Sequence, residues 1–146
     1  MTEPHEGLRA FERLVGTWDV RGSQDGPDGE IHGQVRYEWF TGGHFLVQHV
    51  NLVYIDHDVI GVEYIGYGRD FMGNAPEHCT SHLFDANGSF FTYVWQLEDD
   101  TLTIWGGEIG SPAFYRGMFS ADGNTLTGAW QWPGGGYSTV STRVAA

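Results

Sequence analysis

Hydrophobic and polar residues alternate along most of the chain, in short segments that end at Gly, Asp or Asn. This alternation is typical of β-strands with one buried face. It predicts ten strands, at 17–22, 30–41, 43–55, 59–67, 77–85, 89–97, 101–106, 112–120, 124–132 and 137–145. Strands at about ten-residue spacing with short connections indicate an antiparallel meander. Closing such a sheet removes its edges, so an up-and-down barrel is favoured over an open sheet.

The breaks between these strands carry residues that hairpin turns favour. The clearest breaks are 25–29, 41–43, 85–88, 98–100, 122–124 and 133–136. The longest loop, 68–76, contains Phe71 and Met72, which are expected to be exposed. We expect this loop to lie over a mouth of the barrel.

One short helix is predicted ahead of the strands. Leu8, Phe11 and Leu14 recur at a spacing of three, with charged residues between them. They form one apolar stripe on a helix of about two to three turns that ends at Gly16. A helix this short is marginal alone. We therefore expect its apolar stripe to pack against one end of the barrel.

Length and charge narrow the classes of function. The 146 residues predict a single domain, 1–146. Asp and Glu number 19 against 7 Arg and no Lys, which gives a net charge of −12. This charge disfavours nucleic acid and anionic membranes as partners.

Cysteine content and hydropathy give an expectation for the compartment. Cys79 is the only cysteine, so an internal disulfide is excluded. The first residues are acidic and show no signal-peptide pattern. No apolar run approaches the length of about 20 residues that spans a bilayer. These features predict a cytoplasmic protein.

An ordered set of short motifs covers nearly the whole chain. It comprises Leu14-Val15-Gly16-Thr17-Trp18, Tyr37-Glu38-Trp39-Phe40, Gly42-Gly43, Phe45-Leu46-Val47, Glu63-Tyr64-Ile65-Gly66-Tyr67, Phe119-Ser120, Asp122-Gly123, Gly128-Ala129-Trp130 and Arg143. With these motifs the chain resembles the calycin superfamily of lipocalins, fatty-acid-binding proteins and nitrobindins. It is most similar to a bacterial lipocalin-like family of uncharacterised domains. The resemblance implies an all-β, ten-stranded antiparallel up-and-down calycin barrel with a short N-terminal helix.

The resemblance also implies roles for individual residues. In calycins the tryptophan of the first strand packs at the closed end, and a basic residue near the C-terminus stacks on it. Trp18 and Arg143 occupy these positions, which implies a structural pair. Nitrobindins bind haem through a histidine near the C-terminus, but the last histidine here is His82. The Arg-x-Tyr with which fatty-acid-binding proteins hold a carboxylate is also missing, because Val144 and Ala145 follow Arg143. Haem is therefore disfavoured and no cofactor is expected.

His49 and Glu63 are the candidate catalytic residues. Each lies among apolar neighbours on its own strand, and the two strands are neighbours in a meander. The pair could face each other inside the barrel and act as a general acid or base. It could equally be a buried structural hydrogen bond or an outward-facing pair, because alternation does not say which face is inside.

Further candidate ligand contacts are His82, Tyr93, Arg116, Trp130 and Gln131, together with His49 and Glu63. Arg116 would need an anionic group inside a cavity, or it pairs with acidic residues outside. No metal site is expected. His78 and His82 are four residues apart on one strand, about 13 Å, so they cannot share a metal ion.

Three hypotheses for function remain open on the sequence. The favoured one is the binding of a small, mostly apolar ligand inside the barrel. The alternative is a cofactor-free isomerase, cyclase or lyase that moves a proton on a hydrophobic metabolite in the same cavity. The third is a filled barrel that acts as an interaction protein and forms a homodimer through an apolar outer face.

Overall fold

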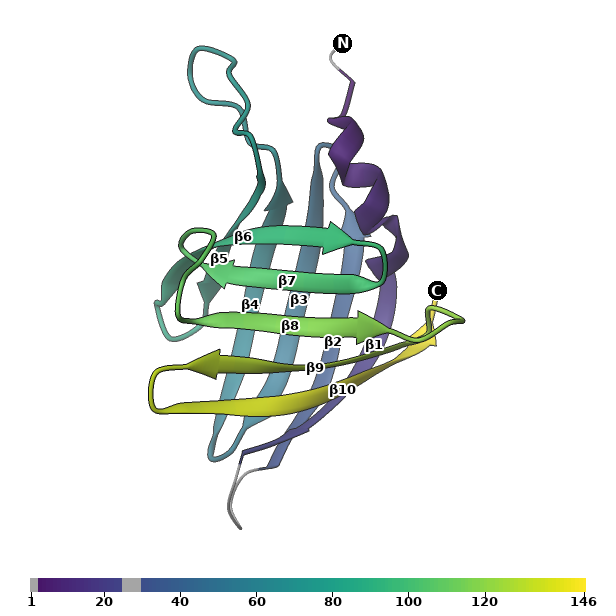
Figure 1. The fold of residues 1–146 in the computed structure, drawn as a ribbon, viewed down its shortest axis with the longest axis vertical. Helices are drawn as coiled ribbons and strands as arrows, with labels where there is room; N and C mark the ends of the chain where they lie inside the picture. Colours follow the sequence, from purple (N-terminus) through teal and green to yellow (C-terminus); the bar gives the residue numbers. More distant parts are fainter. Residues whose placement is uncertain (1–2, 25–29) are drawn as a thin grey trace.

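The chain folds into a closed antiparallel β-barrel of ten strands, in a computed structural model that describes residues 3–24 and 30–146 (Figure 1). The strands are β1 (Gly16–Ser23), β2 (Glu30–Trp39), β3 (Phe45–Tyr54), β4 (His57–Gly66), β5 (Cys79–Asp85), β6 (Phe90–Glu98), β7 (Thr101–Gly106), β8 (Phe114–Phe119), β9 (Thr125–Trp132) and β10 (Gly135–Ala145). Each strand pairs with its neighbours in sequence, and β1 pairs with β10 to close the sheet. The predicted fold class is confirmed, and every strand bound lies within about two residues of its prediction. The predicted turn at 25–29 lies outside the described residues.

The period-two pattern places alternate side chains inside the barrel. On β4, for example, Glu63 and Ile65 point inward and are buried, with exposed fractions of 5% and 0%. Their neighbour Tyr64 points outward and contacts Phe40 on the outer surface. The hydrophobic core consists of such inward-facing residues from β1 to β9 and of the apolar side of the N-terminal helix.

The predicted helix is a 3₁₀ helix, η1 (Glu6–Leu14). A 3₁₀ helix has 3.0 residues per turn, so a spacing of three places Leu8, Phe11 and Leu14 on one line. All three are buried, and Phe11 packs its ring edge against Trp95 with centroids 6.3 Å apart. The helix thus covers one end of the barrel (Figure 1).

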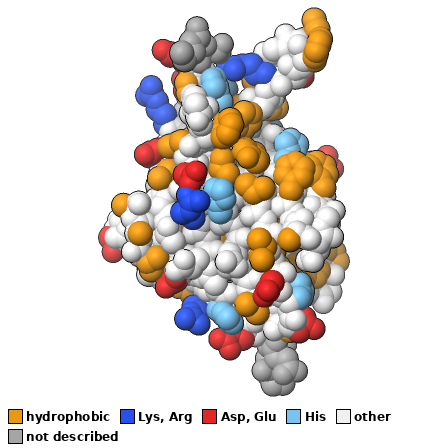
Figure 2. All heavy atoms as spheres, turned by 180° about the vertical axis from the view of Figure 1, so that it is seen from behind, with side chains coloured by type: hydrophobic (Ala, Val, Ile, Leu, Met, Phe, Trp, Pro, Cys, Tyr) orange, Lys and Arg blue, Asp and Glu red, His pale blue; other side chains and the backbone are white. Residues whose placement is uncertain are grey.

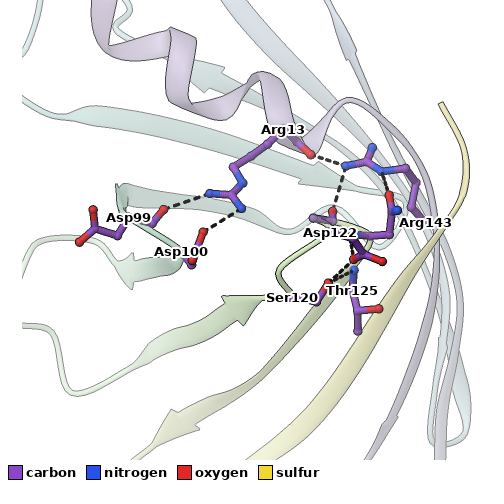
Figure 3. Close-up of polar contacts among 9 residues, drawn as sticks. Arg13, Asp99, Asp100, Ser120, Asp122, Thr125 and Arg143 are labelled. Carbon is purple, nitrogen blue, oxygen red and sulfur yellow. Dashed lines mark hydrogen bonds and ion pairs between the residues drawn. The ribbon is translucent and has the colours of Figure 1, made fainter.

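Arg143 on β10 fastens this covered end, as Figure 3 shows. Its guanidinium lies 4.3 Å from the ring centroid of Trp18, which confirms the expected stacking. It donates hydrogen bonds to the backbone carbonyls of Arg13 and Val15 and, at 3.3 Å, to that of Gly123. One side chain therefore joins the helix C-terminus, β1 and the β8–β9 turn.

Arg13 forms a second clamp at the same end (Figure 3). Its guanidinium donates to the backbone carbonyl of Asp99 at 3.0 Å and to the carboxylate of Asp100 at 3.1 Å, both in the β6–β7 turn. It also lies 4.1 Å from the ring centroid of Phe119. Arg13 therefore holds the helix end to the β6–β7 turn and to the end of β8.

The long loop between β4 and β5 lies at the same end of the barrel as the N-terminal helix (Figure 1). Phe71 and Met72 are exposed, as predicted, with exposed fractions of 102% and 79%. The expectation that this loop lies over the barrel mouth is wrong, because it joins the strand ends that the helix covers. Within the described residues, no helix is long and apolar enough to cross a membrane.

Candidate functional site

The barrel encloses a cavity of about 390 Å³. Most of its lining is aliphatic or aromatic. The aliphatic part comprises Val20, Ile31, Val35, Val50, Leu52, Val59, Leu83, Leu102, Ile104 and Leu126, and the aromatic part Tyr37, Tyr93, Trp95, Tyr115, Trp130, Trp132 and Tyr137. The remaining lining residues are Gln48, Glu63, Thr139 and Ser141. Among the described residues no arginine or histidine lines it.

The cavity extends to the end of the barrel opposite the helix. Trp132 and Tyr137 line it beside the β9–β10 turn and contact each other with ring centroids 5.9 Å apart. Tyr54, at the end of β3, packs on Tyr137 at 5.3 Å and accepts a hydrogen bond from Gln24. A second hollow adjoins this region and shares Trp130, Trp132 and Tyr137. These aromatic side chains define the mouth of the cavity.

Glu63 lies deep in the cavity, next to the residues that pack on the helix. Gln48 donates to Oε1 of Glu63 at 2.8 Å. Ser81 and Trp95 donate to Oε2 at 2.5 and 3.3 Å, and Trp95 also donates to the Ser81 hydroxyl at 3.0 Å. We call these four residues, Gln48, Glu63, Ser81 and Trp95, the floor cluster.

Burial raises the pKa of Glu63 to about 7. The desolvation of the carboxylate raises the pKa, and the hydrogen bonds from Ser81, Trp95 and Gln48 only partly oppose that effect. Near neutral pH this carboxyl therefore exchanges between its charged and neutral forms. A group with such a pKa can hold a ligand donor or move a proton.

Several tyrosine hydroxyls surround the cavity and stay protonated. Burial raises the pKa of Tyr93 and of Tyr115 to about 12. It also raises the pKa values of Tyr37 and Tyr137 well above the ordinary value. These four phenols can donate or accept hydrogen bonds but carry no charge near neutral pH.

Two glycines make room for Tyr115. Gly117 on β8 and Gly128 on β9 lie opposite each other in the sheet. A Cβ atom at Gly128 would lie 2.6 Å from the Tyr115 hydroxyl and 2.5 Å from the carbonyl oxygen of Arg116. One at Gly117 would lie 2.3 Å from the same hydroxyl. The phenol therefore lies flat against a part of the barrel wall that has no side chains, which keeps the cavity open.

The predicted pairing of His49 with Glu63 is wrong. The residue opposite Glu63 is Gln48, and His49 lies opposite Val62. Because neighbouring residues on a strand face opposite sides, His49 stands on the outer surface, where its side chain is 42% exposed. Its Nε2 lies 3.8 Å from the carboxylate of Glu38. Desolvation, and then the charge of Arg36, lower its pKa.

Three other predicted ligand contacts also lie outside the cavity. His82 is exposed on β5 and stacks on Phe90 with centroids 5.9 Å apart. Arg116 lies on the outer face of β8, with its guanidinium 5.0 Å from the ring centroid of Phe114. Gln131 is exposed and lines the hollow beside the mouth. Each lies on the strand face opposite to the one that forms the cavity wall.

The structure places three predicted residues on the cavity wall: Glu63, Tyr93 and Trp130. Tyr93 and Trp130 contact each other with ring centroids 5.7 Å apart. Of the predicted residues, these are the ones that the barrel brings together. Sequence reasoning missed the other members of the floor cluster, Gln48, Ser81 and Trp95.

Cys79 is buried beside the floor cluster, with an exposed fraction of 1%. Burial, and the nearby charge of Glu63, raise its pKa to about 12, so the thiol is unreactive near neutral pH. No group of three or more His, Cys, Asp or Glu side chains in the described part of the chain could hold a metal ion.

The outer surface also carries hydrophobic side chains, and Figure 2 shows them gathered on the face opposite the view of Figure 1. Large exposed examples are Phe40 at 50%, Ile60 at 49%, Phe84 at 48% and Phe90 at 56%. Phe84 and Phe90 contact each other with centroids 5.1 Å apart. We call Phe84 and Phe90 the outer apolar patch.

Comparison with known proteins shows the fold alone. No family model and no curated protein sequence matches this chain. The structure is similar to that of Rv2717c from M. tuberculosis, with a TM-score of 0.58 and 14% identity over 97% of this chain and 99% of that one. A de novo designed fluorescence-activating β-barrel matches with a TM-score of 0.49 and 16% identity, over 92% of this chain and 97% of that one. The structure of EF1p2_mFAP2b bound to DFHBI also gives 0.49, with 12% identity over 95% of this chain and 100% of that one. The likeness to Rv2717c covers almost the entire barrel.

Proposed function

We propose that this protein is a calycin-type barrel that binds one small, mostly apolar molecule in its interior. The observation that carries the proposal is the cavity of about 390 Å³, with its largely aliphatic and aromatic lining and the floor cluster at its deep end. Sites for small organic molecules typically have volumes of about 300–1,000 Å³, apolar walls and a few placed polar groups. A filled barrel is not supported, because it would leave no cavity larger than a few water molecules.

A neutral solvatochromic dye, prodan, tests this proposal directly. We expect one dye per chain to bind with blue-shifted emission. Leu52→Trp places an indole ring in the cavity from β3. Binding should weaken by about tenfold or more, because the dye loses its apolar contact area with the part of the cavity that the indole occupies. Val53→Trp is the matched control, because residue 53 is the next residue on the strand and faces outward. It should bind the dye like the wild type.

Two results of this titration would contradict the proposal. Equal binding by Leu52→Trp and the wild type would place the dye outside the barrel. Failure of the wild type to bind any dye would mean that the cavity does not admit a molecule of this size.

The second candidate function is proton transfer on the bound molecule, without a cofactor. One observation favours it: a carboxyl group with a pKa of about 7 lines the cavity. Glu63 alone would be the acid or base, because His49 is outside the barrel. Glu63→Gln separates the two functions, because it should retain dye binding and lose turnover of a substrate.

Three further expectations belong to this proposal. The outer apolar patch is where a homodimer would form.

Cys79 fits a reducing, cytoplasmic location, because it is a buried free thiol. Haem is not part of the proposed ligand set, because no histidine in the described residues lines the cavity.

A further inference from the structure

The carboxylate of Glu63 has an acceptor position left for a ligand. A carboxylate offers about four acceptor positions on its two oxygens. Ser81 and Trp95 both donate to Oε2, whereas Gln48 alone donates to Oε1. Because Glu63 lines the cavity, the remaining position on Oε1 is available to a donor in the cavity.

No positive charge among the described residues compensates this carboxylate. Gln48 on β3, Ser81 on β5 and Trp95 on β6 donate as neutral groups. The titratable groups whose charge affects Glu63, or is affected by it, are Tyr37 on β2, Cys79 on β5 and Tyr93 on β6. Each of these would be neutral or negative. An ionised carboxyl buried without a counter-charge is costly, so a cation that enters the cavity gains a strong interaction.

The walls above the carboxylate favour a cation as well. The ring of Trp130 contacts the rings of Tyr93 and Tyr115, both with centroids 5.7 Å apart, and all three line the cavity. The negative π-face of an aromatic ring attracts a cation. The net charge of −12 further attracts cations to the protein and repels anions.

We infer that the molecule bound in the barrel is an amine: an apolar, ring-sized body with a protonated primary or secondary amino group that donates to Oε1 of Glu63. The inference rests on the proposed function and gives it a ligand class. The apolar body occupies the aliphatic and aromatic part of the cavity, and the ammonium group lies at the floor cluster. The negative charge of the Glu63 carboxylate excludes carboxylic acids as ligands.

Three molecules of matched shape test the charge preference: 3-phenylpropylamine, 3-phenylpropanol and 3-phenylpropanoate. Isothermal titration calorimetry at pH 8 should show the amine binding about tenfold or more tightly than the alcohol, and the acid binding most weakly. The preference for the amine over the alcohol should shrink between pH 8 and pH 6, because Glu63 becomes protonated while the amine stays charged. Glu63→Gln should lose the preference for the amine and bind the alcohol at least as tightly, because the ammonium group would then be buried without a counter-charge. Glu38→Gln on the outer face should behave like the wild type.

The inference is overturned if the alcohol binds the wild type as tightly as the amine does, or if the preference is the same at both pH values. It is also overturned if the amine fails to bind a protein whose cavity takes prodan. In each of these cases the proposed function stands. A wild-type protein that binds neither prodan nor any of the three molecules contradicts the proposed function itself. The wild-type comparison decides the matter even if Glu63→Gln folds poorly.

Discussion

The Glu63→Gln variant should be more stable than the wild type at pH 8, and its advantage should shrink by about 2–3 kcal/mol when the pH is lowered to 5. The pKa of Glu63 is about 7 in the folded protein, against an ordinary value of 4.5. Between these two values the folded chain holds a proton that the unfolded chain has released. The contribution of Glu63 to stability is therefore fully present below about pH 4.5 and is lost as the pH rises through 7.

Glutamine removes this ionisation and keeps the hydrogen bonds of the floor cluster. Its carbonyl oxygen can accept from Ser81 and Trp95 in place of Oε2. Its amide can donate to Gln48, whose own amide turns over to present its oxygen. The free energy of unfolding of Glu63→Gln should thus lack the dependence on pH that Glu63 gives the wild type.

Urea denaturation of both proteins between pH 5 and pH 8 measures the difference. Glu38→Gln is the matched control, because Glu38 is half exposed on the outer face of β2. It should follow the wild-type profile. Parallel profiles for the wild type and Glu63→Gln would show that the pKa of Glu63 is not raised.

Arg143→Ala should lower the free energy of unfolding by about 3 kcal/mol, because it removes charge-assisted hydrogen bonds and a cation–π contact together. The carbonyls of Arg13 and Val15 lose their donor, and Trp18 loses the guanidinium 4.3 Å from its ring centroid. The helix end, β1 and the β8–β9 turn would then be held by fewer contacts. Arg143→Lys should recover only part of the loss, because the ammonium group of lysine cannot reproduce the planar set of donors of the guanidinium.

Chemical denaturation of these variants beside Arg21→Ala provides the comparison. Arg21 is 73% exposed and lies 4.0 Å from Glu30, so its removal should cost less than about 0.5 kcal/mol. If Arg143→Ala proved as mild as Arg21→Ala, the guanidinium would not be holding the covered end together.

The fold was predictable because strand alternation and turn chemistry are local signals. Inward side chains such as Ile65 repeat at period two, and the breaks between strands carry Gly, Asp and Asn. The helix type was less accessible, although the spacing of Leu8, Phe11 and Leu14 matches three residues per turn. The stacking of Arg143 on Trp18 followed from the resemblance to calycins rather than from the local pattern.

The partners of Glu63 were missed because of an error in strand register. The predicted strands 43–55 and 59–67 leave 56–58 as the turn between them. The actual turn is tighter, and Tyr54 pairs directly with His57. In an antiparallel hairpin the numbers of paired residues have a constant sum, so this pairing places Gln48 opposite Glu63. A turn centred on His57 would give paired residues the sum 114 and place Asn51 opposite Glu63. The actual turn is centred between Ile55 and Asp56, where the sum is 111.

The inner face of β3 could not be chosen from hydropathy alone. Leu46 on its inner face and Val47 on its outer face are both buried, with exposed fractions of 0% and 5%. A histidine among apolar residues suggests chemistry, so His49 was named as a candidate and Gln48 was not, while the inward face stayed undecided. Ser81 gives no signal in the sequence, because a small polar residue in a strand is unremarkable until the barrel closes around it.

Native mass spectrometry of the protein with prodan tests the central claim most directly, because it counts the molecules held by each chain and reports the oligomeric state. The wild type and Val53→Trp should each retain one dye per chain, and Leu52→Trp should appear without it. Retention of the dye by Leu52→Trp to the same extent, or its absence from all three proteins, would contradict the claim that the barrel interior is a binding site.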